Sequence, residues 1–352
     1  MSILQKYITQ ILVSVTMLAL FGLVCLFSFF SLIDQLGDTG RGNYDIWQAV
    51  TYVMLTTPKL AYELFPIAAV TGSMVTLGIL AQNSELVVVR TSGISRFDLA
   101  LILSRASIIL VVTAVIIGEF IAPVSEETAQ NRRSFAMSEE VTVQTREGFW
   151  ARDGNSFINI VKILPGEVVE DVYIYEFDKD NNLRNSIYAR QASYDNERWV
   201  LNDIEQTSIE NDQISITRYQ QAEWPSLLDP EMINFVMVQP QYLSFFGLIK
   251  YINFLKRNAQ ETLPYEQALW IKLVKPISVW AMILLAILLV QSESRFTPVG
   301  QRVFMGTLIG IIFHIIDQIS GHIGIVYNVH PLVSVAAPTI VLLTAFFYLV
   351  RR

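Results

Sequence analysis

The sequence has few of the residues that build soluble catalytic and metal sites. Charged residues make up 16% of its 352 residues, against about 25% in soluble domains. It contains three histidines and one cysteine, Cys25, which excludes an intrachain disulfide and a cysteine-rich metal site. It lacks a Gly-x-x-x-x-Gly-Lys-Ser/Thr loop, a His-Glu-x-x-His motif and a Gly-x-Ser-x-Gly elbow. The sequence contains no stripe of basic residues of the kind that binds nucleic acid. We therefore expect a non-enzymatic chain without a cofactor or metal of its own.

The sequence is rich in long apolar stretches without charged residues. Three stretches carry no Lys, Arg, Asp or Glu, namely 7–33, 64–84 and 318–350. A membrane-spanning helix needs about 20 mostly apolar residues, so these stretches indicate a polytopic membrane protein. We expect six spans, near 11–33, 62–82, 99–121, 266–290, 302–320 and 332–350. A separate helix is expected over 45–59, and Pro123 is expected to end the third span.

The middle of the chain has a different character. Residues 124–240 carry a net charge of −11, and the remainder carries +4. Apolar and polar residues alternate at 172–177 and 213–217, between recurrent turn signals, which is typical of short antiparallel strands in a sandwich or roll. The predicted fold is therefore a polytopic α-helical membrane protein with three spans, an inserted antiparallel β domain, and three more spans.

The expected boundaries are 1–123 for the first three spans, 124–240 for the β domain and 241–352 for the rest, beginning with an amphipathic helix over 243–257. Candidate inward residues of the β domain, filling a closed core or lining an apolar interior, are Phe157, Ile160, Tyr173, Tyr175, Phe177, Trp199 and Ile216.

Cations in the short loops predict the orientation of the spans. If six helices alternate, one side receives Lys6, Arg90, Arg96, Arg295, Arg302, Arg351 and Arg352. That side is predicted to be cytoplasmic, with both termini, and the β domain is predicted to lie outside the cytoplasm.

Several motifs along this arrangement resemble the LptF/LptG family of lipopolysaccharide exporter permeases, and its LptG branch in particular. They are Ile33-Asp34-Gln35-Leu36, residues 80–88 with Arg90 and Ser92-Gly93, Gly118-Glu119 with Ala122-Pro123, Trp150 to Asn155, and Asp317-Gln318-Ile319. The resemblance runs from about residue 5 to the C-terminus.

The resemblance implies an inner-membrane permease subunit, with its β domain a periplasmic jellyroll. It implies pairing with LptF and power from a dimer of the ATPase LptB, which would bind the ATP and Mg²⁺. Lipopolysaccharide would enter sideways from the outer leaflet and leave through the jellyroll to LptC and LptA.

Residues 83–95 correspond to the coupling helix of the family. The resemblance implies that the ATPase is contacted by Glu85, Leu86, Val89 and Arg90. From the residues alone, a solvated turn is an equal interpretation.

Lipopolysaccharide carries phosphates, which call for Lys or Arg. Candidates for the substrate cavity are Asp34, Arg41, Arg132, Arg133, Lys272, Lys275 and Asp317, the last with His314 on the same helical face. Ionisable groups at membrane depth are functional candidates by default, although Lys272 and Lys275 could instead reach the interface. Phe27, Phe30 and Phe313 are candidates for the acyl-chain lining, or for ordinary packing.

Three other functions remain open on the residues. One is a proton- or ion-coupled carrier that uses His314 and Asp317 as a relay. Another is a lipoprotein-release type of permease, in which the outside domain would follow the first span rather than the third. The last is an envelope scaffold without a substrate.

Overall fold

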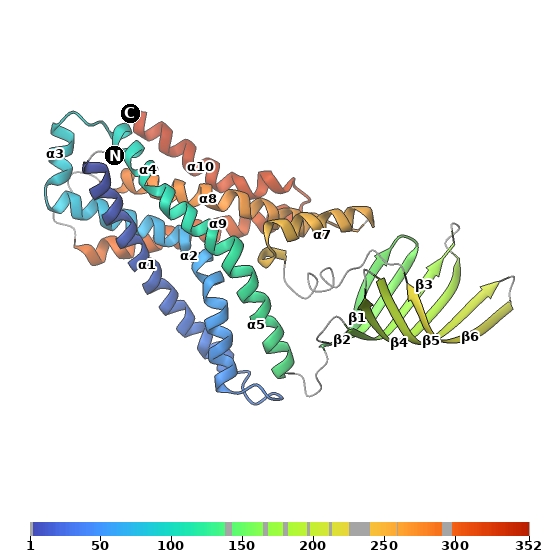
Figure 1. Cartoon of the computed structure of the whole chain (residues 1–352). Helices are drawn as coiled ribbons and strands as arrows, with labels where there is room; N and C mark the ends of the chain where they lie inside the picture. The colour runs from blue at the N-terminus through green and yellow to red at the C-terminus, as the bar shows by residue number, and fades with distance from the viewer. Residues whose placement is uncertain are drawn as a thin grey trace.

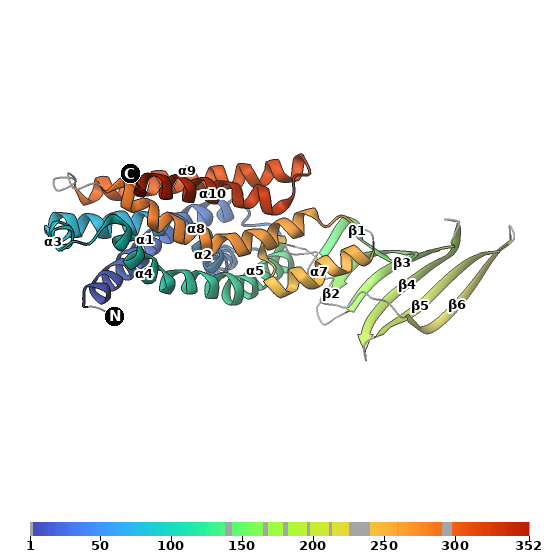
Figure 2. The same cartoon turned by 90° about the horizontal axis from the view of Figure 1, so that it is seen from above.

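The structure, a computed structural model, is a bundle of long helices with a curved β domain beyond one end (Figure 1). The residues that it describes are 3–137, 143–164, 168–178, 182–195, 198–210, 213–224, 240–258, 260–290 and 298–351. Both chain ends and the short helix α3 (Glu85–Thr91) lie at the end of the bundle away from the β domain (Figures 1 and 2).

Six helices among the described residues are long and apolar enough to cross a membrane. They are α1 (Ile3–Leu36), α2 (Ile46–Gln82), the continuous helix of α4 (Arg96–Ile116), η1 (Ile117–Ile121) and α5 (Ala122–Met137), then α8 (Leu263–Leu289), α9 (Val299–Val326) and α10 (Pro331–Arg351). The predicted arrangement of three spans, a β domain and three spans is confirmed. A short 3₁₀ turn, η2 (Pro240–Tyr242), and the amphipathic helix α7 (Phe245–Arg257) lead from the β domain to α8.

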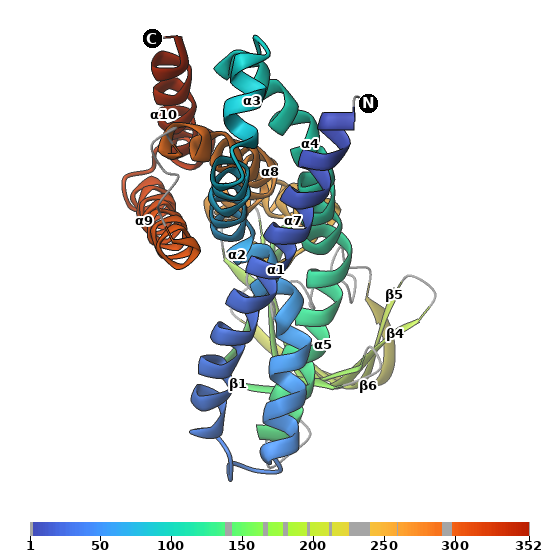
Figure 3. The same cartoon turned by 90° about the vertical axis from the view of Figure 1, so that its left-hand side faces the viewer.

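Helix α2 is the centre of the bundle. It packs against α1, α5, α8 and α9, and Figure 3 shows α9 and α10 on one side of it, α4 on the other and α1 crossing it. Glycines allow the close approach: a Cβ on Gly306 or Gly310 of α9 would lie 2.8 or 2.9 Å from the Cα of Thr71 or Ile67. This spacing of small residues every four positions is a common way to pack helices in membranes.

Helix α2 is also longer than the sequence suggested. The separate helix expected over 45–59 and the span over 62–82 form one helix of 37 residues, which passes through Pro58 and Pro66. Asp45 caps it by accepting a hydrogen bond from the Gln48 amide at 2.8 Å. Tertiary packing on several sides outweighs the lost backbone hydrogen bonds.

The third span does not end at Pro123 as expected. The chain widens into the π-helical segment η1, where the Ala122 N–H donates to the carbonyl of Ile117, five residues back. Pro123 has no N–H, so it cannot donate to the Gly118 carbonyl in the same pattern. The helix nevertheless continues to Met137, and neither Ala122, which donates to Ile117, nor Pro123 donates to the Gly118 carbonyl.

The β domain is one antiparallel sheet whose strands follow each other in chain order. Its strands are β1 (Val143–Asp153), β2 (Ser156–Leu164), β3 (Val168–Phe177), β4 (Leu183–Asp195), β5 (Arg198–Glu210) and β6 (Gln213–Trp224). The sheet is strongly curved (Figure 1). The inserted antiparallel β domain that the strand and turn signals predicted is therefore confirmed.

One face of the sheet is buried, and α7 packs with it. The buried cluster includes Ile158, Ile174 and Leu201 of the sheet together with Tyr251 and Phe254 of α7. Of the predicted inward residues, Ile160 and Trp199 are buried, whereas Phe157 and Ile216 are exposed, and Tyr173, Tyr175 and Phe177 are half-buried. The error has a simple cause: Val172 and Ile174 point inward, so the intervening aromatic residues point to the other face.

Candidate functional site

Helix α3 joins two spans at the end of the bundle where the chain begins and ends. Glu85 starts it and accepts hydrogen bonds from the Tyr7 hydroxyl at 3.1 Å and the Asn83 amide at 3.2 Å. Leu86 is 3% exposed and belongs to the core of the helical bundle. Its side chain therefore fastens α3 to the spans and does not face a partner.

The outward side of α3 consists of valines. Val88 is 62% exposed, Val87 is also exposed, and Val89 is half-buried. The backbone of Arg90 lies in the helix, and its side chain lies outside the described residues. The next helix begins with a capping box between Ser95 and Asp98, which fixes where α4 starts. A short, rigidly attached helix with an apolar outer face suits contact with another protein.

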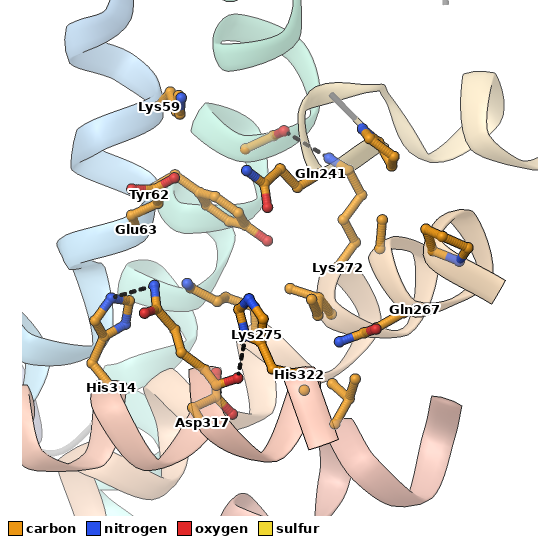
Figure 4. Close-up of a pocket in the computed structure, with 18 of the residues that line it drawn as sticks. Lys59, Tyr62, Glu63, Gln241, Gln267, Lys272, Lys275, His314, Asp317 and His322 are labelled. Atoms are coloured by element: carbon orange, nitrogen blue, oxygen red, sulfur yellow. Dashed lines mark hydrogen bonds between the residues drawn. The ribbon is translucent and has the colours of Figure 1, made fainter. Parts of the chain in front are cut away.

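A cavity of about 350 Å³ opens between α2, η1, α8 and α9, near the β-domain end of the bundle (Figure 4). Seven ionisable side chains and a tyrosine line it, together with Gln241 of η2 and Gln318 of α9. These eight residues are Lys59, Tyr62, Glu63, Lys272, Lys275, His314, Asp317 and His322. Sequence analysis named Lys272, Lys275, His314 and Asp317, and the structure brings all four to this cavity.

Lys272 is committed to the bundle itself. Its ammonium donates to the Glu119 carboxylate at 2.8 Å and to the Gly118 carbonyl at 3.2 Å. The other oxygen of Glu119 accepts from the Phe245 amide at the start of α7, also at 2.8 Å. The Glu119 carboxylate thus joins η1, α8 and α7. The Lys272 ammonium also supplies a donor to the Gly118 carbonyl of the π-helical segment.

Lys275, one helical turn further on, is arranged differently. Its ammonium lies 5.4 Å from the centre of the Tyr62 ring, and the carboxylates that act on it electrostatically are Glu63 and Asp317. Glu63, Lys275 and Asp317 come from α2, α8 and α9, respectively, and face the same cavity. None of the three forms an ion pair or hydrogen bond with another residue in the described part of the chain.

The histidines on α9 are oriented by Gln318. The Gln318 side-chain nitrogen lies 3.2 Å from Nε2 of His314, and the backbone carbonyl oxygen of Gln318 lies 2.8 Å from Nδ1 of His322 (Figure 4). An amide nitrogen only donates and a carbonyl only accepts, so Nε2 of His314 accepts and Nδ1 of His322 donates. Among the described residues, no group of three metal-ligating side chains comes together.

A second cluster of polar residues lies near the C-terminal end of α1. Asp38 pairs with Arg41 and with Arg133, each at 2.8 Å, and thereby ties the turn after α1 to α5. Asp34 and Arg132 are exposed. Nearby, the Tyr44 hydroxyl donates to Gln35 at 3.0 Å, and burial raises the pKa of that hydroxyl. Of the predicted cations here, Arg132 is thus exposed, whereas Arg133 is held by Asp38.

The predicted phenylalanines fall into two environments. Phe27 and Phe30 are exposed on α1, and Phe30 is 58% exposed. Phe313 is 9% exposed and packs in the core of the bundle. The two residues on α1 can contact acyl chains or a partner helix, whereas Phe313 lies within the packing of this chain.

Sequence reasoning missed Glu119 and Asp38 as structural anchors, and Tyr62 and Glu63 as cavity residues. A weak signal existed for Glu119, because it is an ionisable residue inside an apolar helix and such a residue needs a partner. Nothing local to 62–63 predicts that these side chains meet α8 and α9.

Residues 6–352 of the chain match the family described as lipopolysaccharide export system permease LptF/LptG. The chain belongs to the LptF/LptG family. The protein named lipopolysaccharide export system permease protein LptG from Haemophilus influenzae is 32% identical over 351 residues, covering 99% of this chain and 98% of that protein. The protein of the same name from Escherichia coli K12 is 34% identical over 340 residues, covering 96% and 94%. The resemblance seen in the sequence is confirmed, and the six spans are those of a multi-pass permease.

Proposed function

We propose that this LptF/LptG permease is the LptG-type subunit of an ATP-driven lipopolysaccharide exporter in the bacterial inner membrane. The observation that carries the proposal is the match over nearly its whole length to two relatives named LptG. The inserted β domain agrees with it, because a domain after the third span is what the LptF/LptG arrangement requires. ATP and Mg²⁺ would be bound by the partner ATPase.

Helix α3 is the proposed contact with that ATPase, a dimer of LptB. A motor outside the membrane can move the spans only through a segment fixed to them. Leu86 supplies the attachment and Val87 and Val88 supply an exposed apolar surface. Glu85, with its hydrogen bonds to Tyr7 and Asn83, anchors the start of the helix.

The substrate path is proposed to run beside α1 and into the β domain. Most of the α1 surface is exposed and apolar, with Phe27 and Phe30 on it, which suits acyl chains and a second permease, LptF. Exposed cations at the end of α1 and on α5, Arg41 and Arg132, suit the phosphates of lipid A. The β domain would then pass the lipid to LptC and LptA.

The proposed orientation has both termini in the cytoplasm and the β domain in the periplasm. Lys6, Arg90 and Arg96 lie at the end that bears α3, and an excess of cations in short loops marks the cytoplasmic side.

A pull-down of the tagged chain from its native membranes in mild detergent tests the assembly. The expected result is recovery of a small cytoplasmic ATPase and a second permease with three plus three spans. Lipopolysaccharide release from proteoliposomes should then require ATP. Transport that follows a pH gradient and needs no ATPase would overturn the proposal in favour of a carrier.

Variants of α3 test the coupling surface. Val88→Asp places a charge on the exposed face and should abolish recovery of the ATPase while the chain remains folded. Ile214→Asp, at an exposed position of the β domain, is the matched control and should leave recovery unchanged. Full recovery with Val88→Asp would exclude this face of α3 as the contact.

A further inference from the structure

The cavity of Figure 4 contains three charged groups that form no ion pair or hydrogen bond with the described residues. Lys59 is paired with Glu126 at 3.3 Å, and Lys272 is paired with Glu119 at 2.8 Å. One ammonium, that of Lys275, and two carboxylates, those of Glu63 and Asp317, line the same space. Ionisable groups at membrane depth are costly unless they are paired or wet.

The sign of these charges restricts what could bind. A simple anion would meet Lys275 but would also face two carboxylates. A simple cation would meet the carboxylates but would be repelled by Lys275. A group that carries both an ammonium and a phosphate satisfies both requirements, because the carboxylates accept from the ammonium and Lys275 donates to the phosphate. The volume of about 350 Å³ lies at the lower end of the range of roughly 300–1,000 Å³ for small-ligand sites.

An apolar groove continues from the cavity along α9. It is lined by Ile315, Ile319 and Ile323, and it shares Gln318 and His322 with the cavity. The three isoleucines, Gln318 and His322 are all exposed. A polar cavity that opens onto an apolar groove has the two halves that an amphipathic molecule needs.

We propose that this cavity binds the headgroup of an ethanolamine phosphodiester lipid, with an acyl chain along α9. Glu63 and Asp317 accept hydrogen bonds from the primary ammonium, and Lys275 donates to the phosphate. The site is separate from the exposed cations around α1 and α5, and only its glycolipid source rests on the proposed export function. Two sources share this headgroup chemistry: phosphatidylethanolamine of the surrounding bilayer, and a glycolipid decorated with phosphoethanolamine.

The test is lipid binding to the purified permease complex, measured by native mass spectrometry in mild detergent. Dioleoyl phosphatidylethanolamine should bind roughly tenfold more tightly than phosphatidylglycerol, which lacks the ammonium, and than phosphatidylcholine, whose ammonium cannot donate. Equal affinity for the three lipids in the unaltered protein would overturn the proposal and leave a cavity filled with water.

Two variants test whether the residues of the cavity bind the lipid. Glu63→Gln and Lys275→Met should each weaken phosphatidylethanolamine binding about tenfold, since the first removes the negative charge that faces the ammonium and the second removes the donor to the phosphate. The matched controls are Glu127→Gln on α5 and Lys6→Met at the exposed start of α1, and both should bind normally. Unchanged binding in Glu63→Gln and Lys275→Met would overturn the assignment.

Competition distinguishes the two sources. If the bilayer lipid is the ligand, glycolipid with phosphoethanolamine should not displace it. If the glycolipid is the ligand, the decorated form should displace it, with the same loss in Glu63→Gln, and the undecorated form should not. Displacement by decorated and undecorated glycolipid alike would overturn the headgroup assignment.

Discussion

Lys272 of α8 and Glu119 of η1 form an ion pair at 2.8 Å that joins two spans far apart in the sequence. The pair forms beside the Gly118 carbonyl of the π segment, and Lys272 donates to that carbonyl as well. Because Glu119 also accepts from the first amide of α7, the contact extends to the segment that follows the β domain. The pair therefore connects the third span with the helix that packs against the β domain.

Replacing Lys272 with Met should destabilise the bundle strongly. The change leaves the Glu119 carboxylate without its cation and removes a donor from the Gly118 carbonyl. Breaking a buried pair costs about 3–5 kcal/mol, and since the Glu119 side chain is 21% exposed, we expect roughly 2–4 kcal/mol. Thermal unfolding of the permease in detergent measures this, with Lys6→Met as the control. Equal Tm values for the two variants would show that the pair contributes little.

A pair of glycines on one helix provides a second prediction. Gly310→Ala would place a Cβ 2.9 Å from the Cα of Ile67, so α9 must move away from α2. Gly300→Ala, on the same helix, meets nothing within 4 Å. We expect Gly310→Ala to lower stability by about 1–3 kcal/mol and Gly300→Ala to change it by less than about 0.5 kcal/mol. A lower Tm for Gly300→Ala than for Gly310→Ala would contradict the packing described.

The sequence predicted the spans and strands because both depend on local patterns. Apolar runs of sufficient length indicated six spans, and alternation with turn signals indicated an antiparallel sheet. The missed features depend on distant contacts. The helix continues through Pro123, and Lys272, some 150 residues away, donates to the nearby Gly118 carbonyl. The inward face of β3 could not be chosen between two apolar sets, Val172 with Ile174 or Tyr173 with Tyr175.

The candidate site was predicted in part for the same reason. Charges inside apolar stretches are visible in a sequence, so Lys272, Lys275 and Asp317 were found. Their roles were not visible, because pairing with Glu119 or exposure to a cavity depends on how the spans cross. Leu86 was expected at a partner surface, and its burial follows from the way α3 lies against the bundle.

The β domain provides a prediction about pH. The Tyr188 hydroxyl donates to Asp171 at 2.8 Å, and this hydrogen bond to a carboxylate raises the pKa of Tyr188 to about 12. The unfolded chain has a tyrosine pKa near 10, so the contribution of Tyr188 to stability is complete below pH 10 and is lost as the pH rises toward 12. Unfolding of the domain in the full chain, followed by tryptophan fluorescence, should show this decline. Tyr188→Phe should make the decline between pH 10 and 12 shallower, and an identical decline would exclude Tyr188 as its source.

Two adjacent arginines on α5 separate a structural cation, Arg133, from Arg132, which we propose contacts the substrate. Arg133 is held by Asp38 at 2.8 Å and lies over the Tyr52 ring, whereas Arg132 is exposed. Arg133→Gln should lower stability by about 1 kcal/mol, because the turn after α1 loses one of its contacts with α5. Arg132→Gln should leave the Tm unchanged but weaken lipopolysaccharide binding about fivefold, through the loss of one phosphate contact. Tm and lipopolysaccharide affinity measured on both variants check this division. If Arg132→Gln binds lipopolysaccharide normally and Arg133→Gln does not, the phosphate contact must belong to Arg133, and its ion pair with Asp38 must open when the lipid arrives.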